Sequence, residues 1–317
     1  MVDVLLAGPY PAGTLEKLQK AVEGTDISIR AVLTEEEFAK ENDVDGIILR
    51  IIKMPKEVIQ RFSPKLKMIM RWGVGYDAVD VQQARVQGID VCNTPGANAY
   101  AVSELAVLLM LAVGRCLLCH SLELRKGVWS REIFTSQSRS LNHKVVGLVG
   151  GNIGRQVARK VQAFGARVQY YDPIRLKPEM EKEFDMEYVD YETLLATSDV
   201  ISFHVPLVDS TRHMLNKENI KTVKKGAIII NTSRSGIVED EAIVEARKAG
   251  LISGAGLDCT EESPISKDNP LLQDPNIIVT PHVGGTANDI GDTIIPMIVE
   301  NLKRMVEGKS LKFVVNK

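Results

Sequence analysis

The sequence predicts an α/β protein with two Rossmann-like, doubly wound parallel-sheet domains and a cleft between them. Three observations lead to this fold class. Short apolar runs alternate with polar, helix-period stretches twice along the chain, a Pro95-Gly96 breaker separates the two sets, and a glycine-rich turn follows the first strand of the second set. The 317 residues are enough to bury two hydrophobic cores.

The first set of strands lies in the first hundred residues. Its apolar runs are VDVLLAG, ISIRAV, DGIILR, KMIMRWG and IDVCNT, and the stretches TLEKLQKAVEG and KEVIQRF between them have helical periodicity. Strands that alternate with helices are typical of βαβ units, so we expect a parallel sheet here.

The second set follows a long helix expected from Asn98 to about Arg125, which could act as a hinge. Six strands are expected: KVVGLVG, RVQYYD, DVISFHVP, GAIIINTS, ISGAGLD and NIIVTPH. One amphipathic helix, from about Asp289 to Gly308, remains, and a single helix cannot form a domain. We therefore expect it to pack on the first domain, giving a discontinuous domain of residues 1–97 plus 289–317 and a second domain of residues 98–288.

Composition and charge favour small molecules as partners. The formal net charge is −2 with both signs mixed throughout, so neither a nucleic-acid stripe nor a polybasic membrane anchor is present. The most apolar segment, LAVLLMLAVG, stops at Arg115 and is too short to span a membrane. The four cysteines lie in apolar segments, as buried thiols do, and C-x-x-C at Cys116 and Cys119 has no second pair. We expect a cytoplasmic protein without a metal site.

The stretch VVGLVGGNIGRQ predicts a dinucleotide-binding turn. Small residues let the backbone approach a pyrophosphate, and the N-terminus of the following helix supplies free N–H groups. Asp172 ends the next strand about 20 residues further on, where an acid accepts hydrogen bonds from the adenosine ribose. Because an aspartate repels a 2′-phosphate, the cofactor is expected to be NAD rather than NADP.

Polar residues gather at the carboxyl ends of the later strands, where doubly wound sheets bind ligands. The segments concerned are His204-Val205-Pro206, Thr232-Ser233-Arg234, Asp258 and Pro281-His282. The Arg234 guanidinium is suited to bind a carboxylate in bidentate fashion, and the His282 imidazole can exchange a proton with an alcohol or carbonyl oxygen. Beside a nicotinamide, this pair is what hydride transfer to a 2-oxo acid needs.

With these segments assembled, the chain resembles the D-isomer-specific 2-hydroxyacid dehydrogenase family nearly end to end. The matching motifs are RWGVGYDAVD, NTPGANAYAVSELA, HVPLVDSTRHML, INTSRSGIVEDEAI, GAGLD and NIIVTPHVGG. The resemblance implies that Arg234 binds the substrate carboxylate and polarises the keto group, that His282 is the general acid or base, and that backbone N–H groups around Val74 and Gly75 hold the carboxylate. It also implies cofactor contacts from Gly151, Asn152, Ile153, Asp172, His204, Val205, Pro206, Thr232, Ser233, Asp258 and Gly284.

The chain departs from the family pattern in two places. The turn usually reads G-x-G-x-x-G, whereas Gly150-Gly151-Asn152-Ile153-Gly154 is one residue short, which predicts a tighter pyrophosphate loop. The family's catalytic glutamate falls on Ser263, with Glu262 one position earlier. Three alternatives stay open: Glu262 reaches His282 through a shifted loop, the Ser263 hydroxyl orients the imidazole and leaves its pKa lower, or the chain has become a poor catalyst.

The sequence thus predicts an NAD-dependent enzyme that interconverts a small 2-oxo acid and its D-2-hydroxy acid, of hydroxypyruvate (glycerate) or phosphoglycerate type. The alternative is an NAD-binding regulatory protein of the same fold with little or no dehydrogenase activity. Arg50, with Lys53 and Arg71, ends or follows a strand of the first domain and is a candidate for binding a second anionic group of the substrate. The segment from Arg115 to Asn142 is long for a connection, and the resemblance implies a dimerisation arm, so we expect a homodimer.

Overall fold

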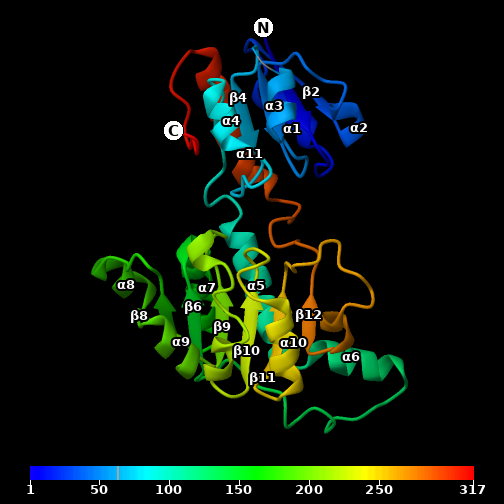
Figure 1. Ribbon diagram of the computed structural model, residues 1–317, viewed down its shortest axis with the longest axis vertical. Coiled ribbons are helices and arrows are strands. Elements are labelled where there is room, and N and C mark those ends of the chain that lie inside the picture. The colour runs from blue at the N-terminus through cyan, green and yellow to red at the C-terminus, as the bar shows by residue number, and fades with distance from the viewer. Residues whose placement is uncertain (63) are drawn as a thin grey trace. The chain divides into compact units, whose positions relative to one another are not determined.

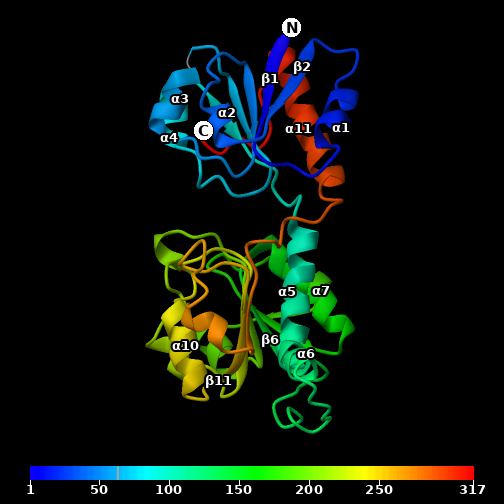
Figure 2. The ribbon, with the colours of Figure 1, turned by 90° about the vertical axis from the view of Figure 1, so that its right-hand side faces the viewer.

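The computed structural model describes residues 1–62 and 64–317. These residues form two compact units, the first made of Met1–Asn98 with Thr286–Lys317 and the second of Ala99–Gly285. Figure 1 shows the discontinuity of the first unit, because the red C-terminal helix α11 lies among the blue and cyan elements. Each unit is a parallel sheet with helices on both faces (Figures 1 and 2).

The first unit has a five-stranded sheet in the order β2-β1-β3-β4-β5, so the strand order reverses between β1 and β3. Figure 2 shows α1 and α11 on one face of this sheet and α3 and α4 on the other. The elements are β1 (Val2–Ala7), α1 (Thr14–Ala21), β2 (Ile27–Val32), α2 (Glu35–Phe38), β3 (Gly46–Leu49), α3 (Lys56–Phe62), β4 (Met68–Arg71), α4 (Val81–Val86), β5 (Asp90–Cys92) and α11 (Gly291–Val306).

The five expected strands of this unit form for the reason the sequence indicates. The central strand β3, GIIL, is buried along its whole length, because helices cover both faces of a parallel sheet. Its side chains join Phe38, Ile59 and Phe62 in one hydrophobic cluster. The edge strand β2, ISIRAV, instead alternates buried and half-buried residues.

The second unit has a seven-stranded sheet in the order β12-β11-β10-β9-β6-β7-β8, with its reversal between β6 and β9. The elements are α5 (Ala99–Gly114), α6 (Leu117–Arg125), β6 (Val145–Val149), α7 (Gly151–Ala163), β7 (Arg167–Tyr171), α8 (Pro178–Phe184), β8 (Met186–Tyr188), α9 (Tyr191–Thr197), β9 (Val200–Phe203), the 3-10 turns η1 (Asp209–Thr211) and η2 (Asn219–Thr222), β10 (Ala227–Asn231), α10 (Asp240–Lys248), β11 (Ile252–Leu257), the 3-10 turn η3 (Pro270–Gln273) and β12 (Ile277–Val279).

Two hydrophobic clusters fill the faces of this sheet. On one face, α5 and α7 pack against the strands through residues such as Leu109, Met110 and Val157. On the other face, α10 packs through Ala242 and Ile243. The strand reversal at β6 and β9 lies between these layers, so ligand-binding residues are expected at the carboxyl ends of these two strands.

The structure differs from the sequence expectation at two elements. The helix expected from Asn98 to Arg125 is broken: α5 and α6 meet at a bend of 60°, and Cys116 between them has a φ of 49°. The left-handed residue ends one helix and begins the next, a change that apolar periodicity does not reveal. The sheet also has a seventh strand, β8, where only six were expected, because a three-residue edge strand is too short to give a pattern.

In the described parts of the chain, 1–62 and 64–317, no single helix is both long and apolar enough to cross a membrane. The bent pair α5 and α6 meets the length and composition criteria only when the two helices are taken together.

Candidate active site

The glycine turn is built at the carboxyl end of β6. Gly150 and Gly151 have φ angles of 85° and 67°, in the left-handed region where glycine is favoured. A Cβ on Gly150 would lie 2.3 Å from Val205 Cγ1, and one on Gly151 would lie 3.0 Å from the His204 carbonyl oxygen. The end of β9 therefore packs directly against the turn, and a Cβ at either glycine would be strained by the positive φ and crowded by β9.

Asp172, which follows β7, is half-buried beside the same turn. Its Oδ2 accepts a hydrogen bond from the Gly151 N–H at 3.2 Å, and its Oδ1 accepts one from the Ile174 N–H at 2.9 Å. The neighbouring Gly150 N–H donates to the Tyr171 carbonyl oxygen at 2.9 Å. The turn and the strand-end acid are therefore tied together by hydrogen bonds.

Two buried polar atoms at the carboxyl ends of neighbouring strands have no hydrogen-bond partner among the described residues: His204 Nδ1 and Thr232 Oγ1. They follow β9 and β10, and each residue is only 6% exposed. Burial lowers the pKa of His204 to about 3, so the imidazole is neutral, and its Nε2 lies 2.9 Å from Ser202 Oγ. Buried polar atoms in proteins are nearly always paired, so these two fit a site that receives polar groups of a cofactor.

Arg234 lies beyond β10 in a loop that Asn231 holds in place. Asn231 Nδ2 donates to the Arg234 carbonyl oxygen at 2.9 Å, and Asn231 Oδ1 accepts from the Ser233 N–H at 3.1 Å and the Ser233 hydroxyl at 2.7 Å. The Arg234 Nη1 donates to the Ser233 carbonyl oxygen at 2.8 Å. Our sequence analysis missed Asn231, although a polar residue at the end of the apolar run AIIIN was a signal.

Asp258 holds the loop that carries His282. Its Oδ1 accepts from the Thr280 hydroxyl at 2.7 Å and the Val283 N–H at 2.8 Å, and its Oδ2 accepts from the Gly284 N–H at 2.8 Å. Asp258 is 2% exposed, whereas His282, with a φ of 55°, lies on the exposed part of the loop. A buried carboxylate therefore holds the Thr280 side chain before the imidazole and two backbone N–H groups directly after it.

The segment that follows Asp258 contains the two candidates for the acid. Glu262 Oε2 accepts a hydrogen bond from Asn269 Nδ2 at 2.7 Å, and the Glu262 carbonyl oxygen accepts one from the Thr260 hydroxyl at 2.8 Å. Glu262 and Ser263 are both exposed. The Glu262 carboxylate therefore has a partner in its own loop.

Glu261 anchors this segment to α10 and to the loop after β9. Its N–H donates to Asp240 Oδ2 at 2.8 Å, and its Oε1 lies 2.9 Å from His213 Nε2. Burial raises the pKa of Asp240 to about 6. The sequence analysis did not single out Glu261, since a surface carboxylate gives no signal until the fold places it beside a histidine.

In the first unit, the loop after β4 contains Val74 and Gly75. Asn93 Nδ2 donates to the Val74 carbonyl oxygen at 2.8 Å, and Arg71 Nε donates to the Gly75 carbonyl oxygen at 3.0 Å. The N–H groups of Val74 and Gly75 have no acceptor among residues 1–62 and 64–317. Two amide donors are thus held in a braced loop and are free to bind an anion.

Arg50 follows β3 at the same edge of this sheet. Its Nη1 donates to the Pro9 carbonyl oxygen. Close by, Tyr10 donates to the Ile48 carbonyl oxygen at 3.0 Å, and burial raises its pKa although the charges of Arg71 and Arg50 lower it. The carboxyl edge of the five-stranded sheet therefore carries positive charge.

Comparison with known proteins identifies the family. The profile of the D-isomer specific 2-hydroxyacid dehydrogenase, NAD binding domain, matches residues 107–284, which include the glycine turn, Asp172, Arg234 and His282. The chain belongs to this family. Such an enzyme is an NAD-dependent oxidoreductase that acts on 2-hydroxy acids.

The relatives of this dehydrogenase include enzymes with different substrates. The chain is 38% identical to a glyoxylate reductase of Thermococcus litoralis over 91% of the chain and 87% of that protein. It is 36% identical to a D-3-phosphoglycerate dehydrogenase of Methanocaldococcus jannaschii over 100% of the chain but only 60% of that protein. Among solved structures, the TT0316 protein from Thermus thermophilus is 34% identical, with a TM-score of 0.85 over 99% of both chains. The predicted fold class is confirmed.

Proposed function

We propose that the chain uses NADH to reduce a small 2-oxo acid to its D-2-hydroxy acid, or catalyses the reverse reaction, with Arg234 and His282 as the catalytic residues. The observation that supports this role is the independent bracing of the two loops by Asn231 and Asp258. A guanidinium and an imidazole held on fixed backbone are what orientation of a reacting substrate requires.

In the proposed mechanism, the substrate carboxylate pairs with the Arg234 guanidinium and accepts hydrogen bonds from the N–H groups of Val74 and Gly75. When bound, NADH would supply the hydride that reduces the keto carbon, and NAD would accept a hydride in the reverse direction. His282 gives its proton to the developing alkoxide, which a positively charged guanidinium also stabilises. In the reverse direction, neutral His282 removes the hydroxyl proton.

The remaining proposals concern the cofactor and the two units. We assign residues 98–288 to NAD binding and residues 1–97 plus 289–317 to substrate binding. The adenosine ribose is assigned to Asp172 and the pyrophosphate to the N-terminus of α7 at Gly151, Asn152 and Ile153. The list of cofactor contacts is completed by His204, Val205, Pro206, Thr232, Ser233, Asp258 and Gly284.

For the substrate, we propose a two- or three-carbon 2-oxo acid. Glyoxylate, hydroxypyruvate and phosphohydroxypyruvate differ in the group opposite the carboxylate, and Arg50 is the residue that a second anionic group would contact. Positive charge at the carboxyl edge of the five-stranded sheet supports this assignment.

The experiment is NADH oxidation with glyoxylate, pyruvate, hydroxypyruvate and phosphohydroxypyruvate, measured together with direct NADH binding. Turnover of at least one of them supports the dehydrogenase function. If all four are inert while NADH still binds, the alternative role of a nucleotide-binding regulator is favoured. Arg50→Gln should raise KM for phosphohydroxypyruvate more than for glyoxylate if Arg50 contacts a second anion.

We further propose a homodimer formed through the segment from Arg115 to Asn142. Large apolar side chains are exposed along it, including Leu117, Leu122, Trp129 and Ile133. An exposed apolar stretch of this kind favours contact with another protein surface. A cytoplasmic location is also proposed, and it is supported by the four free cysteines, three of them buried.

A further inference from the structure

The shortened glycine turn has a feature that its sequence does not explain. Asp172, the residue proposed to bind the adenosine ribose, accepts a hydrogen bond from the turn itself. The N–H of Gly151, the first residue of α7, donates to Asp172 Oδ2 at 3.2 Å. The N–H groups in the first turn of a helix have no acceptor inside the helix, and in a dinucleotide site they face the pyrophosphate. In this chain, one of these donors is bonded to a side chain.

The backbone on both sides of this bond is held in place. The Asp172 Oδ1 accepts from the Ile174 N–H at 2.9 Å, so the carboxylate cannot rotate without losing a second hydrogen bond. The Gly150 N–H donates to the Tyr171 carbonyl oxygen at 2.9 Å, one residue before Asp172. Two consecutive N–H groups of the turn are thus bonded to two consecutive residues at the end of β7.

The missing residue provides a reason for this contact. In G-x-G-x-x-G, one residue separates the first two glycines, whereas Gly150 and Gly151 are adjacent in this chain. On the other side the turn lies close to β9, since a Cβ placed on Gly151 would lie 3.0 Å from the His204 carbonyl oxygen. Bonding to Asp172 satisfies the N–H that the short turn directs toward β7.

We propose that Asp172 is a positioning residue for the pyrophosphate loop as well as the ligand of the adenosine ribose. Ribose recognition and pyrophosphate recognition are then coupled through one carboxylate. The inference rests on the proposed placement of the ribose at Asp172, and the two roles are separable by experiment. The ribose role needs hydroxyl groups on the cofactor, whereas the positioning role does not.

The test compares NADH with an NADH analogue whose adenosine ribose lacks its 2′- and 3′-hydroxyls, by fluorescence titration of wild type and Asp172→Ala. We expect Asp172→Ala to lower the affinity for the dideoxy analogue by about fivefold to tenfold, because the loop is no longer held, and to lower the affinity for NADH by more. Unchanged affinity for the dideoxy analogue overturns the positioning role and leaves the ribose role intact. Equal losses for both ligands keep the positioning role and reject the ribose assignment.

The control is Glu187→Ala in β8, which removes one exposed carboxylate from the neighbouring strand. Without ligand, Asp172→Ala should have a lower Tm than Glu187→Ala, since it loses two backbone hydrogen bonds; equal values contradict the proposal. Should Asp172→Ala not fold, Asp172→Asn takes its place: it loses one of the two acceptors, so it should bind the dideoxy analogue more weakly than wild type does. Binding equal to that of wild type contradicts the proposal.

A second variant tests the cause. Inserting one alanine between Gly150 and Gly151 restores the G-x-G-x-x-G spacing, and Gly151 no longer needs the carboxylate. In the variant with this insertion, Asp172→Ala should leave the affinity for the dideoxy analogue unchanged and still lower the affinity for NADH. Persistence of the full effect on the dideoxy analogue would show that the short turn is not the reason for the contact.

Discussion

At the scale of single residues, the proposed catalytic groups depend on buried neighbours that touch backbone. Arg234 and His282 follow different strands, and the loops that carry them are fixed by Asn231 and Asp258, respectively. Charged acceptors with several donors make strong hydrogen bonds, so the Asp258 carboxylate can support the loop of His282 without taking part in proton transfer.

Asp258→Asn tests this support. The amide keeps one acceptor but places an NH₂ group beside a backbone N–H, and the change should lower the free energy of unfolding by about 2 kcal/mol or more. Urea denaturation measures the loss, with the exposed Asp268→Asn as a control expected to change little. Equal stability of the two variants would show that Asp258 does not hold the loop.

Arg234→Lys tests the proposed carboxylate contact. Lysine keeps the positive charge but cannot form a bidentate pair, so transition-state binding should weaken by about 1 to 3 kcal/mol while NADH affinity stays nearly unchanged. The measurements are kcat/KM and an NADH titration. A parallel loss of NADH binding would indicate a structural role for Arg234 instead.

The residue that partners the His282 imidazole is tested by pH profiles of kcat/KM for wild type, Glu262→Gln and Ser263→Glu. If Glu262 is the partner of His282, Glu262→Gln lowers the imidazole pKa and the reductive rate, by about tenfold for each pKa unit once the pH exceeds that pKa. If the Ser263 hydroxyl is the partner, Glu262→Gln has little effect, and Ser263→Glu extends activity to higher pH. Three superimposable profiles would exclude both residues.

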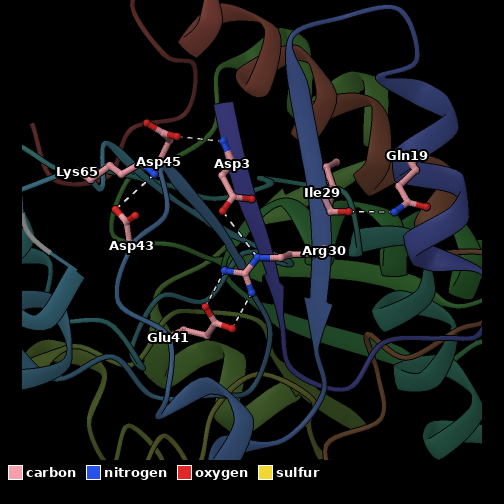
Figure 3. A network of polar contacts seen from close by, with 8 residues as sticks. All are labelled: Asp3, Gln19, Ile29, Arg30, Glu41, Asp43, Asp45 and Lys65. Atoms are coloured by element: carbon pink, nitrogen blue, oxygen red, sulfur yellow. Dashed lines mark hydrogen bonds and ion pairs between the residues drawn. The ribbon is translucent and has the colours of Figure 1, made fainter. Parts of the chain in front are cut away.

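At the scale of elements, a network of polar contacts lies along the strands of the first sheet (Figure 3). Arg30 of β2 donates to both oxygens of Glu41 at 2.6 Å and lies 3.7 Å from Asp3 Oδ2 of β1. The Asp3 N–H donates to Asp45 Oδ2 at 2.9 Å, just before β3. The network thus connects three neighbouring strands.

The pH dependence of this network has a definite sign. The Arg30 guanidinium lowers the pKa of Glu41 below its usual 4.5, so the pair stabilises the fold above that pH and its contribution disappears as the pH falls through the folded-state pKa. Glu41→Gln should cost about 1 kcal/mol or less at pH 7, since the pair is partly exposed, and less at pH 2 than at pH 7.

Urea denaturation at both pH values checks this prediction. Lys65→Met, which breaks the exposed 3.3 Å pair with Asp43, serves as the control and should have a smaller effect. A Glu41→Gln penalty that is the same at both pH values would contradict an ionic origin.

At the scale of the whole molecule, each unit buries its own hydrophobic core. The exposed apolar side chains between Arg115 and Asn142 belong to neither core. The double change Leu117→Ser and Trp129→Ser should therefore dissociate the proposed homodimer. Sedimentation velocity measures the mass in solution. Ile174→Ser, at a residue that is 82% exposed outside this segment, is the control and should leave the mass unchanged. A monomeric wild type would exclude the dimer.

The sequence alone determined the fold class, the family and the chemistry of the proposed active site. Apolar runs of four to six residues located the strands, because a parallel sheet covered on both faces needs continuous apolar segments. The glycine turn, Asp172, Arg234 and His282 could be read directly, since each is a residue type with specific chemistry at the end of a strand.

Only the tertiary structure decided which side chains support these residues. Four contacts depend on segments that are remote along the chain or turn back on themselves. They are the hydrogen bond that Asn231 donates to the Arg234 carbonyl oxygen, those that Asp258 accepts from loop N–H groups, the pairing of Glu262 with Asn269 and the contact of Asp172 with Gly151. The same holds for the break at Cys116, where one left-handed residue interrupts an apolar pattern that continues through it. Residue type and periodicity report what a segment can do, whereas hydrogen bonds form only where packing brings a donor within reach of an acceptor.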